Sequence, residues 1–130
     1  MHELSIAIAV VEAVDELARR HDADAVDEVR LRVGELAGVE PDALDFAFEV
    51  AREGTLLSTA RFTVERVAAV VRCAPCAVEF HPGTPPNLLC PQCDGGSVEV
   101  LAGRELELAG VGFPAPDHHD EEVTADVPGR

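Results

Sequence analysis

The chain contains no lysine, no tryptophan and no tyrosine, and phenylalanine occurs only five times. Aromatic residues make up 4% of the 130 residues and hydrophobic residues 47%, so the core has to be built from aliphatic side chains and alanine. Asp and Glu number 25 against ten Arg, which gives a formal net charge of −15. Nucleic acid and anionic membrane surfaces require a basic footprint, so this charge argues against both as partners.

Long apolar runs are also missing, and none approaches the roughly 20 residues of a membrane-spanning helix. The N-terminus has no basic stretch before the short apolar run Ile6–Val11, so we expect no signal peptide. We therefore expect a cytoplasmic protein with reduced thiols. The length predicts one domain, or a small domain that carries a smaller insert.

Hydrophobic periodicity predicts two helices. Apolar spacings of three and four residues indicate an amphipathic helix over residues 4–20. Its expected buried face comprises Leu4, Ile8, Val11, Val14, Leu17 and Ala18. Pro41 suits a first helical position and Gly54 a helix stop, which predicts a second helix over residues 41–53. Because apolar residues cover much of its circumference, we expect this helix to be well buried; they are Leu44, Phe46, Ala47, Phe48, Val50 and Ala51.

Alternation of apolar and polar residues predicts strands over residues 25–33 and 62–71, and again at 98–100 and 106–108. In the first strand, the residues expected on one buried face are Val29, Leu31 and Val33. Residues 73–96 differ, because they contain all four cysteines, five of the nine prolines and little periodicity. We expect this module to be inserted between two strands of one sheet.

The predicted organisation therefore has three parts. An α/β domain comprises residues 1–70 plus 98–111, and an inserted zinc-ribbon domain comprises residues 71–97. Residues 112–130 are rich in Pro, Asp and Glu and almost without apolar periodicity, so we expect a disordered acidic tail. Its His118-His119 pair is capable of holding nickel loosely, although a solvated, solubilising tail is the simpler interpretation.

The cysteines form two pairs, Cys73-Ala-Pro-Cys76 and Cys90-Pro-Gln-Cys93, separated by thirteen residues. Two such knuckles present four sulfurs to one ion, which favours tetrahedral Zn²⁺. Four thiolates leave no open coordination position, so the zinc would be structural. Two disulfides, a redox pair or iron in the same cage are the alternatives. His81, inside the loop, is expected to be an exposed residue and not a ligand.

The N-terminal Met1-His2-Glu3 offers a different set of donors. The α-amine of Met1 and the amide nitrogen of His2 form a five-membered chelate, and that amide and the imidazole Nδ1 of His2 form a six-membered one. The amide of Glu3 can complete a plane of four nitrogens, a geometry that suits Ni(II) or Cu(II). The alternative is a solvated, inert His2.

The opening Met1–Ser5 resembles that of the HypA/HybF family, the hydrogenase nickel-incorporation proteins. Further similarities follow in order along the chain, at Val29–Val39, Pro41–Glu49, Gly54-Thr55, the two cysteine pairs and Gly103–Leu108. The resemblance covers roughly residues 1–110. It implies an α+β fold of two helices on a small mixed β-sheet, with the zinc ribbon inserted late in the chain.

This resemblance also implies a function. The protein would be a nickel metallochaperone that holds Ni²⁺ as cargo through His2, with the nitrogens of Met1 and Glu3, and binds structural Zn²⁺ through the cysteines. The implied partners are a nickel-handling GTPase and the large subunit of a [NiFe] hydrogenase, with urease as a possible second recipient. The alternative is a zinc-ribbon protein-interaction adaptor without a nickel role. We expect no enzyme, because there is no nucleophile–base pair, phosphate loop or open metal site.

Overall fold

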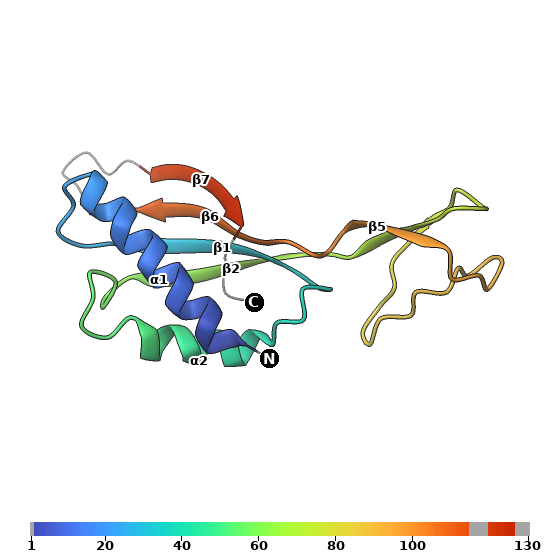
Figure 1. Ribbon diagram of the computed structural model, residues 1–130, viewed down its shortest axis with the longest axis horizontal. Coiled ribbons are helices and arrows are strands. Elements are labelled where there is room, and N and C mark those ends of the chain that lie inside the picture. Colours follow the sequence, from blue (N-terminus) through green and yellow to red (C-terminus); the bar gives the residue numbers. More distant parts are fainter. Residues whose placement is uncertain (1, 115–119, 127–130) are drawn as a thin grey trace.

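Two helices and two separate β-sheets make up the computed structural model, which describes residues 2–114 and the backbone of 120–126. Along the chain the elements are α1 (Glu3–Arg20), β1 (Glu28–Gly34), α2 (Pro41–Ala51), β2 (Arg61–Val67), β3 (Val70–Cys73), β4 (Glu79–Phe80), β5 (Val98–Ala102), β6 (Leu106–Gly112) and β7 (Asp120–Asp126). The first sheet has the order β2-β1-β6-β7, and the second the order β4-β3-β5 (Figure 1).

The first sheet is mixed, because β1 pairs parallel with β2 and antiparallel with β6. The second is antiparallel throughout. Two helices on a mixed sheet, with a cysteine-bearing antiparallel sheet between β2 and β6, confirm the predicted α+β fold class. Of the described residues, neither helix is long and apolar enough to cross a membrane.

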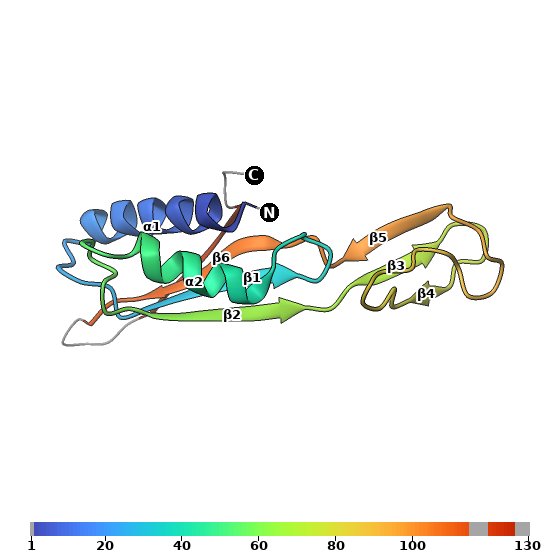
Figure 2. The same cartoon turned by 90° about the horizontal axis from the view of Figure 1, so that it is seen from below.

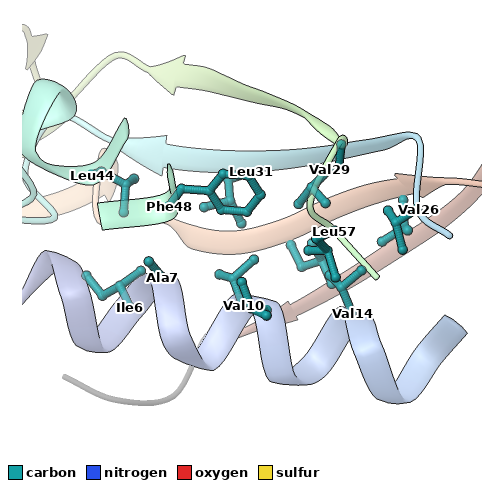
Figure 3. Packing of buried hydrophobic residues seen from close by; sticks show 14 of the residues in the cluster. Ile6, Ala7, Val10, Val14, Val26, Val29, Leu31, Leu44, Phe48 and Leu57 are labelled. Carbon is teal, nitrogen blue, oxygen red and sulfur yellow. The ribbon is translucent and has the colours of Figure 1, made fainter. Parts of the chain in front are cut away.

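Both helices cover the same face of the first sheet, and the core lies between them and the strands (Figures 2 and 3). The predicted inward residues of β1 are confirmed, since Val29, Leu31 and Val33 are buried. The ring of Phe48 on α2 stacks on Phe62 of β2 at 4.0 Å between centroids. The rest of the core is aliphatic, as the composition requires.

The helices bury only some of the residues expected; on α1, Val11, Val14 and Ala18 are buried as predicted. The buried stripe of α1 is centred on Ile6, Val10 and Val14, and Leu4 and Ile8 are exposed. The buried stripe and the exposed Leu4–Ile8 pair both have apolar residues at spacings of three and four. Periodicity alone therefore did not show which of the two faces the sheet. The second helix ends at Ala51 and touches the core along one side only, so the prediction of burial is wrong for two residues. They are Phe46 and Val50.

The predicted strand over residues 62–71 is two strands that belong to different sheets. β2 ends at Val67 and β3 begins at Val70, with residues 68–69 as the connection. After the cysteine pairs, β5 pairs with β3 in the second sheet. The chain returns to the first sheet at β6, which pairs with β1. Val98–Ala102, expected in the first domain, therefore lie in the cysteine-bearing sheet.

Close backbone packing fixes the connection between the sheets. The N–H of Leu36 donates to the carbonyl of Gly103 at 2.6 Å, and Oε1 of Glu35 accepts the N–H of Ala69 at 2.6 Å. A Cβ on Gly34 would lie 2.1 Å from the carbonyl oxygen of Gly103. Glycine is therefore required at residue 34, and the loop after β1 is held against both connecting chains.

The chain beyond β6 differs in part from the expected disordered tail. β6 itself extends to Gly112, and Asp120–Asp126 pair antiparallel with it as β7. A strand added to a sheet edge is held by backbone hydrogen bonds, which require no apolar pattern, so composition did not indicate it. The remainder of the predicted tail, at residues 115–119 and 127–130, lies outside the described residues, as does the His118-His119 pair.

Candidate metal centres

Each cysteine pair lies on a tight backbone turn of the same design. In the first, the N–H of Ala77 donates to the carbonyl of Cys73 at 2.8 Å, and in the second the N–H of Asp94 donates to the carbonyl of Cys90 at 2.8 Å. The residue that follows each pair has a left-handed backbone, with φ of 56° at Ala77 and 57° at Asp94. The left-handed residue of the second turn is thus Asp94, and not one of the glycines after it.

The two turns bring all four sulfurs together. The Sγ atoms of Cys73, Cys76, Cys90 and Cys93 lie within 4.8 Å of one another, and the Sγ atoms of Cys73 and Cys93 are 3.7 Å apart. A tetrahedral ion with metal–sulfur bonds of about 2.3 Å requires sulfur separations of about 3.8 Å. A disulfide would require about 2.05 Å. The cysteines are free, so the donor set fits zinc and the disulfide alternative is wrong.

The surroundings of one sulfur, that of Cys90, already favour a thiolate. The backbone N–H groups of Cys93 and Gln92 point at the sulfur of Cys90 and lower the pKa of its thiol to about 7. The N–H of Gln92 is 3.4 Å from that sulfur. Sharing a hydrogen bond with Cys93, together with burial, raises the pKa of the Cys76 thiol to about 12. A cation that binds here has to displace the proton of Cys76.

Burial within the cluster is uneven. Cys73 and Cys90 are fully buried, whereas Cys93 is exposed. The ring of His81 lies outside the cluster, where its Nδ1 is 2.9 Å from the carbonyl oxygen of Ala69. Among the described residues, the four cysteines are the one group of three or more side chains that are arranged to hold a metal ion.

At the other candidate centre, His2 is exposed and immediately precedes α1. Its carbonyl accepts the N–H of Ile6 at 3.0 Å, and its side chain makes no capping hydrogen bond. The amide of Glu3 belongs to the first helical turn, where the helix supplies no carbonyl acceptor. The imidazole is thus accessible. Met1, the source of the predicted amine donor, lies outside the described residues.

The carboxylate of Glu3 has another role. It is largely buried, with 7% of the residue surface exposed, and its Oε2 accepts the backbone N–H of Glu40 at 2.9 Å. This bond, together with Glu3's own N–H, lowers the pKa of the Glu3 carboxyl. Sequence reasoning missed Glu40, whose side chain also caps α2 by accepting the N–H of Ala43. Its position directly before Pro41 was the sequence feature that marks Glu40 as the cap of α2, although Glu is an unusual capping residue.

The two candidate centres are separate. The start of α1 lies on the helix-covered face of the first sheet, whereas Cys73 ends β3 of the second sheet and the other three cysteines lie in the loops between its strands, at the far end of the connecting chains (Figures 1 and 2). A single ion therefore does not contact both.

Known proteins resemble most of this chain. The profile of the family described as "Hydrogenase/urease nickel incorporation, metallochaperone, hypA" matches residues 1–112. The Hydrogenase maturation factor HypA of Streptomyces avermitilis is 51% identical over 112 residues, which are 85% of this chain and 86% of that protein. The Chloroflexus aurantiacus factor of the same name is 42% identical over 114 residues, 88% of this chain and 100% of that one.

The fold is likewise similar to a solved structure. The Ni metallochaperone HypA from Helicobacter pylori superposes with a TM-score of 0.61 at 24% identity, over 87% of this chain and 97% of that one. At this identity the likeness shows the fold. The profile match and the sequence relatives show more, and from them the chain belongs to the HypA family of hydrogenase/urease nickel-incorporation metallochaperones, which are maturation factors and not enzymes.

Proposed function

We propose that this protein binds Ni(II) at its N-terminus and delivers it during the maturation of a [NiFe] hydrogenase. The donors are the amine of Met1, the amide and Nδ1 nitrogens of His2, and the amide of Glu3. The observation that carries this proposal is the family match, which begins at residue 1 and so includes the Met-His-Glu opening. It is supported by the exposed imidazole and by the position of the two amides where α1 begins, one on the N-cap residue and one on the first helical residue.

The four cysteines would hold zinc, and they supply a closed tetrahedral thiolate site with no position for a substrate. The second sheet contains few buried apolar residues of its own, so metal ligation would provide much of the energy that folds it. Zinc is thus structural and would be held beside the second sheet, whereas nickel is cargo and would be held at the start of α1.

The partners follow from the proposed delivery. A nickel-handling GTPase would load or release the ion, and the large subunit of a [NiFe] hydrogenase would receive it in the cytoplasm. The relatives are named hydrogenase maturation factors, and the family description includes urease, which makes urease a second recipient to test.

Complementation tests this function. A hydrogenase-producing host that lacks its own copy of this protein should regain hydrogenase activity, and nickel in the large subunit, with the native chain but not with His2→Ala. His81→Ala is the matched control, because that histidine is also exposed but lies outside both donor sets. Full restoration by His2→Ala would instead support an adaptor without a nickel role.

A further inference from the structure

The C-terminal strand β7 covers an edge of the first sheet. It pairs antiparallel with β6, whose other side pairs with β1, so β7 is the outermost strand of that sheet (Figure 1). The family profile ends at residue 112, which is also the last residue of β6. The strand that covers β6 therefore lies outside the part of the chain that the profile matches.

The strand beneath, β6, has few of the charges that protect a sheet edge. Charged side chains on an edge strand deter pairing with another chain. β6 has one charged residue in seven, Glu107, whereas β2, at the opposite edge of the same sheet, has three. β7 has four acidic residues in seven and no basic one. Its presence therefore replaces a weakly charged edge by a strongly acidic one.

One row of paired residues runs across β1, β6 and β7. Arg30 pairs with Gly110, and Gly110 pairs with Glu122. Alternate residues of a strand lie on opposite faces, so this row is on the face away from the buried Val29 and Leu31. A Cβ on Gly110 would lie 2.2 Å from Nη2 of Arg30, so the guanidinium extends over the glycine. The row thus carries a cation from β1 across β6, toward the strand that bears Glu122.

The next row on this face has no charge to spare for β7. Arg32 pairs with Glu107, which in turn pairs with Asp126. Arg32 lies 3.2 Å from a carboxylate oxygen of Glu107 and 3.3 Å from one of Glu65, so two acids already balance it. Glu107 and Asp126 are like charges at paired positions, which weakens a sheet. Electrostatic attraction for β7 therefore has to come from the Arg30 row.

Without β7, the edge of β6 fits a second copy of itself. Two antiparallel β6 strands can be aligned with Glu107 opposite Gly112 and Leu108 opposite Val111, so that no like charges face each other. Such a pairing uses the same residues of both copies, as a twofold-symmetric interface requires. In the native chain, β7 occupies the side of β6 that this pairing would use.

We propose that β7 is a latch strand, which keeps the β6 edge from pairing with a second copy of the chain, and that the row of Arg30, Gly110 and Glu122 holds this latch closed. Closure balances backbone pairing and the attraction to Arg30 against the like charges of β7 and β6. An open latch exposes the β6 edge and allows a symmetric dimer to form through it.

Amide exchange in the zinc-loaded, full-length protein measures opening of the latch. Arg30→Gln and Glu122→Gln should each accelerate exchange in β6 about two- to fivefold, the effect of a partly exposed ion pair. Gly110→Ala should do the same, because the new Cβ displaces the guanidinium. The matched controls should exchange like the native chain. They are Glu121→Gln, in the row of Val29 and Val111, and Arg61→Gln, on β2.

A double variant distinguishes a charge pair from two unrelated losses. Arg30→Gln combined with Glu122→Gln should exchange no faster than either single variant, since both changes remove one interaction. Additive acceleration, or native exchange in both single variants, would overturn the role of the row.

Deletion of residues 115–130 tests the covered edge. A relative of Chloroflexus aurantiacus is matched over its whole length by 114 residues, so we expect the shortened chain to fold and retain zinc. Sedimentation should show concentration-dependent association beyond that of the native chain, and a synthetic peptide of residues 115–130 should reverse it. Glu122→Arg in the full-length chain, which places a second cation in the row, should promote the same association. Native sedimentation of both proteins would overturn the latch, as would association that the peptide leaves unchanged.

Discussion

The carboxylate of Glu3 accepts the backbone N–H of Glu40, and this bond ties the residue beside His2 to the first turn of α2. The side chain of Glu3 is thereby engaged in helix packing, so its proposed contribution to nickel is its amide nitrogen alone. The bond also restricts the direction in which the N-terminal residues leave α1. The proposed nickel site is thus built on the contact between two helices.

Replacing Glu3 with Ala should loosen the start of both helices, because the N–H of Glu40 loses its acceptor. Amide exchange at Glu40 should accelerate, whereas Glu3→Gln keeps an oxygen acceptor and should preserve most of the protection. Equal exchange in the native and Glu3→Ala proteins would contradict the role assigned to this carboxylate.

The same contact predicts a pH dependence. The folded-state pKa of Glu3 lies below its usual value of 4.5, so the ionised form stabilises the native state. This contribution is complete above pH 4.5 and is lost as the pH falls through the lower, folded-state pKa. Acid unfolding of Glu3→Gln should therefore show a shallower pH dependence below 4.5, and an unchanged profile would contradict the assignment.

Ala77→Gly should stabilise the cysteine-bearing module, because Ala77 adopts a left-handed backbone that glycine adopts without steric cost. The expected gain is about 1 kcal/mol, seen as tighter zinc binding or greater resistance to chelator. Ala74→Gly is the matched control in the same turn, where no positive φ is required. Equal effects of the two substitutions would show that the backbone strain at Ala77 is not important.

Zinc binding should release protons and weaken as the pH falls. The Cys76 thiol, whose pKa is raised to about 12, is protonated at pH 7, while Cys90, at about 7, is partly ionised. Cys73→Ser or Cys90→Ser should lower zinc content and increase proteolysis within residues 73–96, and His81→Ala should change neither. Calorimetry in buffers of different ionisation enthalpy measures the released protons. Full zinc occupancy in either Cys→Ser variant would contradict a four-thiolate site.

Local chemistry made the cysteine cluster predictable from sequence. In each cysteine pair, two residues separate the cysteines, and this short spacing determines the turn independently of the rest of the fold. The half-buried strand β1 was predictable for a similar reason, since alternation at Val29, Leu31 and Val33 allows one buried face.

Features that depend on distant neighbours were not predictable. Phe46 and Leu4 have the periodicity of core residues, and only the packing of each helix on the sheet decides that they are exposed. The break between β2 and β3 follows from the loop after β1, where Glu35 holds Ala69. The Glu3–Glu40 bond joins residues 37 positions apart and leaves no local signal.

The most direct test of the central claim is a nickel titration of three zinc-loaded proteins: the native chain, His2→Ala, and a chain extended by one or two residues before Met1. The extension keeps His2 but converts the Met1 amine into an amide. We expect tight, yellow-orange, diamagnetic square-planar Ni(II) in the native protein only, and we expect binding to weaken as the pH falls because every nitrogen donor must lose a proton. Zinc content should be equal in all three. Equally tight nickel binding by the extended chain would contradict the account and move the site to side chains, with His81 or the His118-His119 pair as the next candidates.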